Sequence, residues 1–422
     1  MIMKPEVTSV AFREFVDHRH VPVIMQVVPA LNSGGVEQGV IDLNAAIVKA
    51  GGHSIVVSNG GTRVREIVKA GGTHIALPVH SKNPFIITAN IARLRKIIRD
   101  NNVDIVHACS RAPAWSAGRA VQGTSAKYVT SVHSAHKITS SLKRLYNSSL
   151  TKGERVIAVS HFLADYLEKN YQVDASKICV VHRGVALEKF HPNSVTPDRL
   201  IKIATQWRVP DGAAVIMLPA RLSRLKGHMF LIDAMQQLQR KDFFCLFVGS
   251  DIGNENYRKE LETYIENSGL GGSVRIVSHC DDMPAAYMLA TVVVTPSLEP
   301  EGFGRIAIEA QAMGRPLIAT DHGGSQETIL RDETGWLVQP GDINGLATAL
   351  SEALSLDANQ RAKLATRAMS HIGAHFTNES MCAGTLDVYA ELLNAAVARA
   401  LPSNDRRIAI SNSRGGGKRT SG

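Results

Sequence analysis

Short apolar runs alternate with amphipathic stretches along most of the chain, beginning at Val21. In the first half, these runs predict buried parallel strands. They are Val23–Val28, Ser54–Ser58, Ile75–Leu77, Ile105–Ala108, Tyr128–Val132 and Val156–Val159. Stretches with one apolar face, such as Gly35–Lys49 and Asn90–Arg99, predict helices between the strands. Strands that alternate with helices in this way predict a doubly wound α/β sheet.

The same alternation restarts after a polar, proline-bearing stretch at His191–Pro197. The predicted strands of the second half are Ala214–Leu218, Cys245–Val248, Val274–Val277, Thr291–Thr295 and Leu317–Thr320. A chain of 422 residues exceeds what one hydrophobic core usually supports, so two facing domains are expected. The expected units are a flexible segment (1–20), a first Rossmann-like domain (21–192), a second (198–380), a crossover helix packing back on the first domain (381–401) and a disordered basic tail (402–422).

Candidate chemistry is concentrated between Glu301 and Glu309, after the apolar strand that ends at Ser297. Gly302, Phe303 and Gly304 form a loop whose glycines allow a ligand to approach closely before a helix predicted over Arg305–Gly314. The amides at that helix start suit a phosphate or a hydroxyl-rich ligand. Two carboxylates are poor phosphate ligands but suit neutral polyols. This segment therefore favours a sugar nucleotide, although a plain loop with two solvated glutamates is the alternative.

Arg221 and Lys226 follow the first strand of the second half, near the expected position of Glu301. A diphosphate leaving group must be neutralised by a divalent cation or by fixed cations. The sequence contains no Asp-x-Asp pair that would hold such a metal. Arg221 and Lys226 can supply the charge directly, as a bidentate fork and a point charge. We therefore expect no metal and no cofactor; a solvated basic helix start is the alternative.

In the first half, Gly34 and Gly35 lie between the first strand and the first helix, where a glycine pair permits close approach of a ligand. As a phosphate-loop signal this pair is weak, because the Gly-x-Gly-x-x-Gly spacing is missing. His133 follows a strand end and is placed to reach a ligand in the cleft. His107 and His136 also follow strand ends, but we interpret them as core or surface histidines.

Charge is distributed unevenly along the chain. Residues 1–198 contain 24 Lys and Arg against 14 Asp and Glu, a net +10, whereas the remainder contains 23 against 24, a net −1. A basic first half suggests an anionic partner. The segment from Lys137 to Asn147 combines cations with Ile138, Leu142 and Leu145 and suits an anionic membrane, with a solvated helix face as the alternative. No nucleic-acid partner is expected, because no aromatic-basic interleaving appears.

The chain has no run of about 20 apolar residues and no signal-peptide core near its start. A cytoplasmic protein is therefore expected, with contact limited to the inner face of the cell membrane. The five cysteines are scattered and form no Cys-x-x-Cys pair, so neither a disulfide framework nor a metal site is expected.

Taken together, these residues resemble a large family of retaining glycosyltransferases, family 4, with the GT-B fold of two facing Rossmann-like domains and a deep interdomain cleft. The resemblance runs from about Val23 to about Ala400. Its parts are the Gly34-Gly35 turn, His133, Ala158-Val-Ser160-His-Phe, Arg183-Gly-Val with Phe190-His-Pro192, Arg221 with Lys226, Glu301 to Glu309, and Gly335 to Asp342. Arg183 replaces a common Asn, and Ser278-His279 stands where a glycine often follows the base-reading strand.

The resemblance implies a role for each matching position. Glu301 would contact the donor sugar, and Glu309 the ribose. Arg221 and Lys226 would hold the diphosphate, and the backbone near Val277 would meet the base. His133 would contact the sugar hydroxyls.

The expected activity is transfer of a hexose-type sugar from a nucleotide-diphosphate donor to a hydroxyl acceptor, with retention of configuration. The expected acceptor is a glycan or glycolipid in cell-envelope, lipopolysaccharide or polysaccharide synthesis. The alternatives are a sugar-nucleotide epimerase on the same scaffold and a catalytically silent sugar-nucleotide-binding protein.

Overall fold

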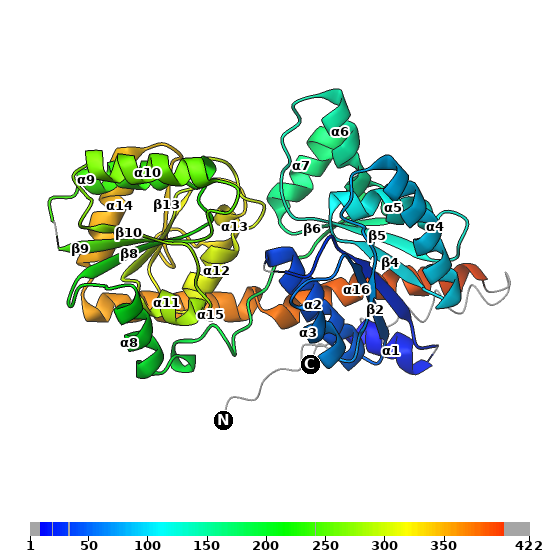
Figure 1. Ribbon diagram of the computed structural model, residues 1–422. Helices are drawn as coiled ribbons and strands as arrows, with labels where there is room; N and C mark the ends of the chain where they lie inside the picture. The colour runs from blue at the N-terminus through cyan, green and yellow to red at the C-terminus, as the bar shows by residue number, and fades with distance from the viewer. Residues whose placement is uncertain (1–8, 19, 33, 241, 401–422) are drawn as a thin grey trace, which may run out of the picture.

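The computed structural model contains two parallel sheets, each covered by helices on both faces (Figure 1). It describes residues 9–18, 20–32, 34–240 and 242–400. The first sheet has the strand order β3-β2-β1-β4-β5-β6-β7, and every pairing within it is parallel. Its strands are β1 (Val23–Val27), β2 (His53–Ser58), β3 (Thr73–Ala76), β4 (Ile105–Ala108), β5 (Lys127–Val132), β6 (Arg155–Ala158) and β7 (Ile178–Val180).

The first half of the described chain contains seven helices. They are α1 (Val10–His18), α2 (Gly35–Lys49), α3 (Val64–Lys69), α4 (Pro84–Asp100), α5 (Arg111–Val121), α6 (Ser141–Asn147) and α7 (His161–Tyr171). Short 3₁₀ turns are η1 (Ser148–Thr151), η2 (Ala175–Lys177), η3 (Pro192–Ser194) and, in the second half, η4 (Arg224–Lys226). Most of these helices are amphipathic and bury one face against the sheet, as the sequence pattern predicts.

The second sheet has the strand order β10-β9-β8-β11-β12-β13, again with parallel pairings throughout. Its strands are β8 (Ala214–Pro219), β9 (Phe243–Val248), β10 (Val274–Val277), β11 (Val292–Thr295), β12 (Leu317–Thr320) and β13 (Trp336–Val338). The helices of this half are α8 (Pro197–Gln206), α9 (His228–Gln236), α10 (Glu255–Asn267), α11 (Met283–Leu289), α12 (Arg305–Ala312), α13 (Ser325–Thr328), α14 (Ile343–Ser355), α15 (Ala358–His375) and α16 (Asn378–Ala400).

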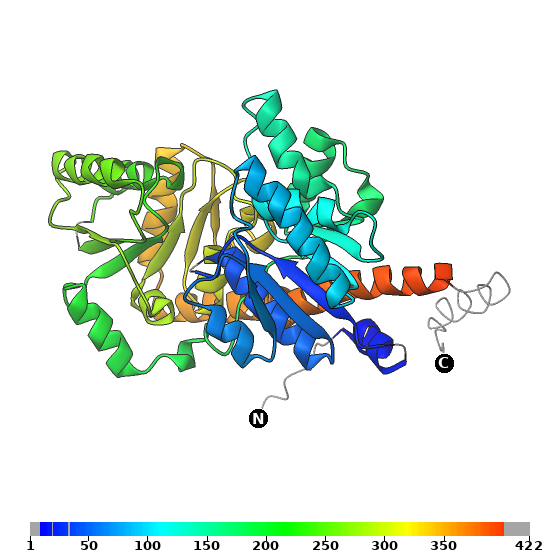
Figure 2. The same ribbon diagram turned by 45° about the vertical axis from the view of Figure 1, so that its right-hand side comes forward.

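The last helix joins the two domains. Figures 1 and 2 show α15 and α16 running one after the other from the second domain beneath the first. Helix α16 packs against α1 and α2, and its buried Leu386, Tyr389 and Leu393 share a core with Ile24 and Ile105 of the first sheet. The expected return of the C-terminal helix to the first domain is confirmed.

The start of the described chain differs from the sequence-based expectation of a flexible segment. Val10–His18 forms α1, and Phe12 and Phe15 are buried against α16 and the first sheet. This nine-residue helix is short but amphipathic, and the partner that buries its apolar face lies more than 350 residues further along the chain. The predicted tail at 402–422 lies outside the described residues. No helix in the part of the chain that the structure describes is long and apolar enough to cross a bilayer.

Strand order places the functional edge of each sheet. The order reverses between β1 and β4 in the first sheet and between β8 and β11 in the second. Ligands of open parallel sheets bind outside the carboxyl ends of the strands at such a reversal. The Gly34-Gly35 turn follows β1, Arg221 and Lys226 follow β8, and Glu301 follows β11. The fold therefore brings the candidate residues to the two switch points.

Candidate active site

A cleft of about 730 Å³ lies between the domains and contains most of the predicted residues. The first domain contributes the Gly34-Gly35 turn, His133 and Arg183. The second contributes Arg221, Lys226 and the Glu301–Arg305 loop. Because both walls carry charged or hydrogen-bonding groups, the cleft suits a polar ligand that spans the two domains.

On the wall formed by the second domain, Lys226 and Glu301 form an ion pair with 2.7 Å between Nζ and Oε1. The Ser297 hydroxyl donates to the same carboxylate oxygen. Burial acts to raise the pKa of Glu301, but the Lys226 ammonium and these hydrogen bonds outweigh it and hold the pKa below its usual range. Glu301 is therefore ionised at neutral pH, and Oε2 has no partner among the described residues, so it can accept a hydrogen bond from a ligand.

Arg221 is the exposed cation of this wall and makes no hydrogen bond or ion pair within the described residues. Its neighbour Arg224 instead pairs with Glu260 and lies over the Tyr257 ring. Arg221 is thus free to bind an anion, whereas Arg224 is held on the outer surface.

The loop between the two glutamates approaches the first domain closely. A Cβ on Gly302 would lie 2.3 Å from the carbonyl oxygen of His133, so only glycine fits there. Gly304 has a left-handed backbone, with φ of 84°, and caps α12. At the start of α12 the amides and the helix dipole favour a negative ligand group. The Arg305 side chain reaches the opposite wall of the cleft. A Cβ added to Gly35 on that wall would lie 3.0 Å from the Arg305 side chain.

Two predicted donor residues lie away from the lining of this cleft. Glu309 is only 9% exposed, and its carboxylate accepts hydrogen bonds from Tyr287 and Arg305 at 2.9 and 2.8 Å. Val277 ends the edge strand β10 and is absent from the cleft lining. Their assignment to ribose and base remains a prediction, and the Glu309 carboxylate is hydrogen-bonded by protein groups.

On the first-domain wall, polar groups lack protein partners. Both ring nitrogens of His133 are buried and make no hydrogen bond in the described residues. Burial, followed by the nearby Arg183, places the pKa of His133 well below its usual range, so the imidazole is neutral at physiological pH. A neutral imidazole offers one donor and one acceptor, which suits a sugar hydroxyl.

Arg183 is a buried cation that sequence reasoning noted only as a departure from the family pattern. Its guanidinium donates to the Gly35 carbonyl and has no carboxylate within ion-pair distance among the described residues. Burial and the neighbouring Arg305 lower the pKa of Arg183 to about 10, although the Asp42 carboxylate acts to raise it. It remains charged at neutral pH, and this charge at the cleft is incompletely neutralised.

His107, interpreted above as a core histidine, is buried between Tyr389 and Ser131, each 2.6 Å from a ring nitrogen. Burial lowers its pKa to about 3. It belongs to a small cavity of about 40 Å³ behind His133 rather than to the open cleft. His107 therefore supports the wall that carries His133.

A separate apolar groove of about 930 Å³ lies on the first domain between α4, α5 and α6. Trp115, Leu142 and Leu145 line it beside the cations Arg119 and Lys143. Leu142 and Leu145 are 80% and 57% exposed, so α6 presents the mixed basic and apolar surface expected from the sequence. Lys137, however, pairs with Glu299 across the cleft.

Sequence reasoning did not identify Glu327 as part of the site. Glu327 follows β12 and the Gly323-Gly324 pair, and its carboxylate reaches the first domain at the start of α7. A glycine pair and a carboxylate after a buried strand are the signal that could have drawn attention to it. Its partners, however, lie more than 140 residues away and leave no local pattern.

Comparison with known proteins agrees with this geometry. A family model described as glycosyl transferases group 1 matches residues 201–371, and one described as glycosyltransferase family 4 matches residues 33–189. The D-inositol 3-phosphate glycosyltransferase of Xylanimonas cellulosilytica is 30% identical over 336 residues, covering 74% of this chain and 78% of the relative. The chain belongs to the group 1, family 4 glycosyltransferases.

Solved structures confirm the GT-B fold for this family member. A glycosyltransferase from Rickettsia africae is 38% identical, with a TM-score of 0.81 over 88% of this chain and 99% of that one. Anabaena HepE, solved with UDP and glucose, is 20% identical, with a TM-score of 0.75 over 88% of this chain and all of that one. The second likeness bears on the fold alone. Both matches extend over the two domains.

Proposed function

We propose that this glycosyltransferase moves a hexose-type sugar from a nucleotide-diphosphate donor to an acceptor hydroxyl, with retention of configuration and without a metal. The observation that carries the proposal is the convergence of Arg221, Lys226 and Glu301 with the glycine loop at one switch point, facing His133.

The leaving diphosphate is received by protein cations in this proposal. Arg221 has no partner among the described residues, and the Lys226 ammonium has three donors, of which Glu301 takes one. Together with the amides at the start of α12, they stabilise the charge that develops on the departing phosphate oxygen. Fixed groups of this kind need no reorganisation during the reaction.

Glu301 is proposed to bind sugar hydroxyls rather than to attack the anomeric carbon. Its carboxylate is ion-paired with Lys226 and hydrogen-bonded by Ser297, which makes it a weak nucleophile. The acceptor hydroxyl then attacks from the face that the diphosphate leaves, and the leaving phosphate oxygen takes its proton. His133 positions the sugar through its neutral imidazole.

The acceptor is proposed to be a glycolipid or glycan of the cell envelope, handled at the cytoplasmic face of the membrane. Arg183 offers an incompletely neutralised charge on the acceptor wall, which suits an anionic group near the attacking hydroxyl. The basic and apolar groove at α6 suits peripheral contact with an anionic lipid surface.

A panel of UDP-, GDP- and ADP-sugars tests the donor assignment directly. We expect the pure protein to release nucleoside diphosphate slowly from one donor and faster when an acceptor is present. A sugar-nucleotide epimerase would return an altered sugar with its diphosphate bond intact, and a silent binding protein would bind the donor without either reaction. The anomeric proton coupling of the product, measured by NMR, reports whether configuration is retained.

Vesicle co-sedimentation tests the membrane part of the proposal separately. The protein is expected to sediment with phosphatidylglycerol vesicles and not with phosphatidylcholine vesicles. Leu142→Glu should weaken this binding, whereas Val68→Glu, at an exposed apolar residue on α3 away from the groove, should not. Equal binding by both variants and the parent protein would remove the groove from the proposal.

A further inference from the structure

Hydrogen bonds link the two domains at the start of α7. Glu327, on α13 of the second domain, accepts hydrogen bonds from the backbone amides of His161 and Phe162, each at 2.9 Å. Helix termini leave these amides without intrahelical partners. The carboxylate of Glu327, from the opposite domain, therefore caps the start of α7 by accepting hydrogen bonds that a side chain next to the helix usually accepts.

Ser160 completes this cap from within the first domain and also reaches the donor loop. Its hydroxyl oxygen accepts from the Leu163 amide at 3.1 Å, and the hydroxyl donates to the carbonyl of Gly302 at 2.6 Å. Ser160 is fully buried, so this hydrogen bond is shielded from water. The loop that carries Glu301 is thereby tied to the first domain.

The turn that precedes Glu327 also packs against the Glu301–Gly304 loop. The Gly324 amide donates to the Glu301 carbonyl at 2.9 Å, and a Cβ on Gly324 would lie 2.3 Å from Cα of Phe303. A movement of Glu327 therefore also moves the loop that carries Glu301, the residue predicted to bind the donor sugar.

His182 holds the outer side of the carboxylate. Its Nε2 lies 2.8 Å from Glu327, and its ring packs against Phe303 and Phe376, with centroids 5.8 and 5.4 Å apart. Burial acts to raise the pKa of Glu327, but the hydrogen bonds from His182 and the two amides hold it below its usual range. The carboxylate is therefore ionised when it caps α7.

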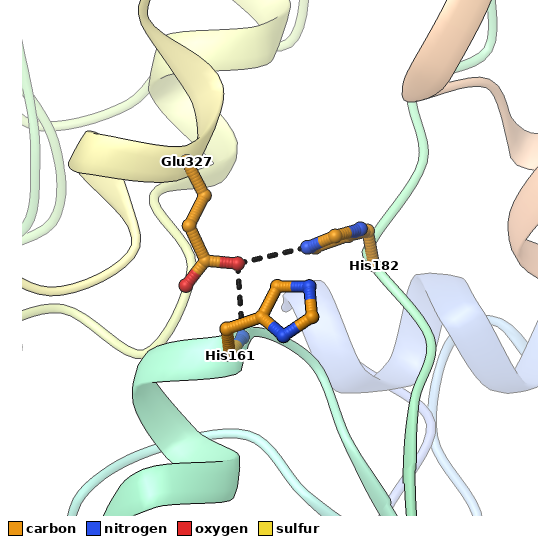
Figure 3. A group of neighbouring side chains, drawn as sticks. All are labelled: His161, His182 and Glu327. Atoms are coloured by element: carbon orange, nitrogen blue, oxygen red, sulfur yellow. Dashed lines mark hydrogen bonds and ion pairs between the residues drawn. The ribbon is translucent and has the colours of Figure 1, made fainter.

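His161, His182 and Glu327 lie close together (Figure 3), and because their candidate ligand atoms lie within 4.8 Å of one another, they are also a potential metal-ligand set. Two features disfavour that reading. Both carboxylate oxygens already accept amide hydrogen bonds, and the start of a helix carries a partial positive charge that repels a cation. The geometry fits a carboxylate cap better than a metal centre.

We infer that Glu327 and Ser160 are positioning residues that dock the Glu301–Gly304 loop onto the start of α7 and so set the donor sugar against His133. The inference rests on the proposed function for its kinetic consequence, but the docking itself does not. Gly302 already touches the His133 carbonyl, so a small shift of the loop changes the relation of the two walls. Misplacement by about 1 Å can reduce turnover by roughly a hundredfold.

Glu327→Gln and Ser160→Ala test the inference in the full-length protein. We expect turnover to fall about tenfold or more in each variant, while the Kd for the nucleoside diphosphate changes less than about twofold, because Arg221 and Lys226 are untouched. Ser160→Thr keeps the hydroxyl and should restore turnover to within about threefold of the parent. Glu168→Gln, at the other end of α7 with no side-chain partner in the described residues, is the matched control.

Hydrogen exchange supplies a readout that does not depend on activity. The amides of the first turn of α7 and of residues 302–304 should exchange at least about tenfold faster in Glu327→Gln, and the control should match the parent. Faster exchange in a protein that transfers no sugar would support the docking while contradicting the proposed function. The experiment therefore distinguishes failure of the docking inference from failure of the proposed function.

Two results would overturn the inference. Parent-like turnover and exchange in both Glu327→Gln and Ser160→Ala would show that the contacts position nothing. Stoichiometric Zn²⁺ binding that His182→Ala abolishes, with slowed exchange of the α7 start only when Zn²⁺ is present, would replace the cap with a metal site. Titration calorimetry with Zn²⁺ alone measures the second outcome.

Discussion

The two walls of the cleft satisfy their charges in different ways. On the wall of the second domain, the proposed donor wall, Lys226 pairs with Glu301 and Arg305 pairs with Glu309, so most charges are balanced within the protein. On the wall of the first domain, the proposed acceptor wall, both buried ring nitrogens of His133 lack a partner among the described residues. The Arg183 guanidinium hydrogen-bonds there to a backbone carbonyl and to no carboxylate. Buried polar groups without partners destabilise a fold unless a ligand or water completes them. The donor wall is therefore preorganised, whereas the acceptor wall presents polar groups that a ligand can complete.

The largest expected effect comes from removing the donor-wall cation. Lys226→Ala should reduce turnover by about a hundredfold or more, because a preorganised charge at the leaving group contributes roughly 3–4 kcal/mol. It also leaves the partly buried Glu301 without its counter-ion. Steady-state kinetics measure the loss, and circular dichroism should show an intact fold.

Lys259→Ala is the matched control for this variant, because Lys259 is exposed on α10 and its side chain has no partner among the described residues. It should leave turnover unchanged. If Lys226→Ala retained near-parent turnover, the assignment of the diphosphate to this wall would be wrong.

The donor wall is also where sequence reasoning succeeded best. Arg221, Lys226 and Glu301 follow strands whose apolar runs are easy to recognise, and the carboxyl ends of parallel strands meet at one edge. Strand position alone therefore placed these residues together. The short edge strands β7 and β13 were not predicted, because an apolar run of only three residues is too short to distinguish a strand from a loop or a helix turn.

Contacts that depend on tertiary packing could not be read from the sequence. Nothing local links Glu327 to α7 or Phe12 to α16, since each pair is separated by well over a hundred residues. Glu309 was expected to face a ribose, but its pairing with Tyr287 and Arg305 depends on how α11 and α12 pack. The sequence indicated the chemistry of the donor wall but not how the two walls are held together.

A smaller effect is expected on the acceptor wall. His133→Ala should lower turnover about tenfold, the size of one or two neutral hydrogen bonds to a sugar. His133→Asn keeps a donor and an acceptor and should lose less. Because the buried ring nitrogens have no partner among the described residues, their removal offsets the loss of packing. His133→Ala should therefore not lower the thermal unfolding midpoint, which differential scanning fluorimetry measures. Substantial destabilisation with unchanged turnover would assign His133 a structural role instead.

Acid should weaken the first domain through its buried histidines. Burial lowers the pKa of His107 to about 3, and that of His136 to about 4. Between those values and the usual value near 6.5, the unfolded chain binds more protons than the folded one, so the free energy of unfolding falls as pH falls. Each histidine contributes at most about 1.4 kcal/mol per pH unit within its window.

Urea unfolding between pH 7 and pH 5 measures how steeply the free energy of unfolding changes with pH. His107→Asn should reduce this slope by the contribution of one histidine. An unchanged slope in that variant would show that His107 accepts a proton without loss of its contacts to Ser131 and Tyr389.

The smallest expected effect is that of removing divalent cations. If Arg221, Lys226 and the amides at the start of α12 neutralise the departing diphosphate, transfer in excess EDTA should stay within about twofold of that in Mg²⁺. The control is Lys226→Ala, which removes part of the fixed charge. Added Mg²⁺ should stimulate this variant more than the parent, because a cation can then bind the phosphate oxygens that Lys226 no longer reaches. A parent protein that required Mg²⁺ strictly would show that the donor wall, despite its balanced charges, is incomplete without a metal. Both walls would then depend on a bound partner, and the contrast between them would disappear.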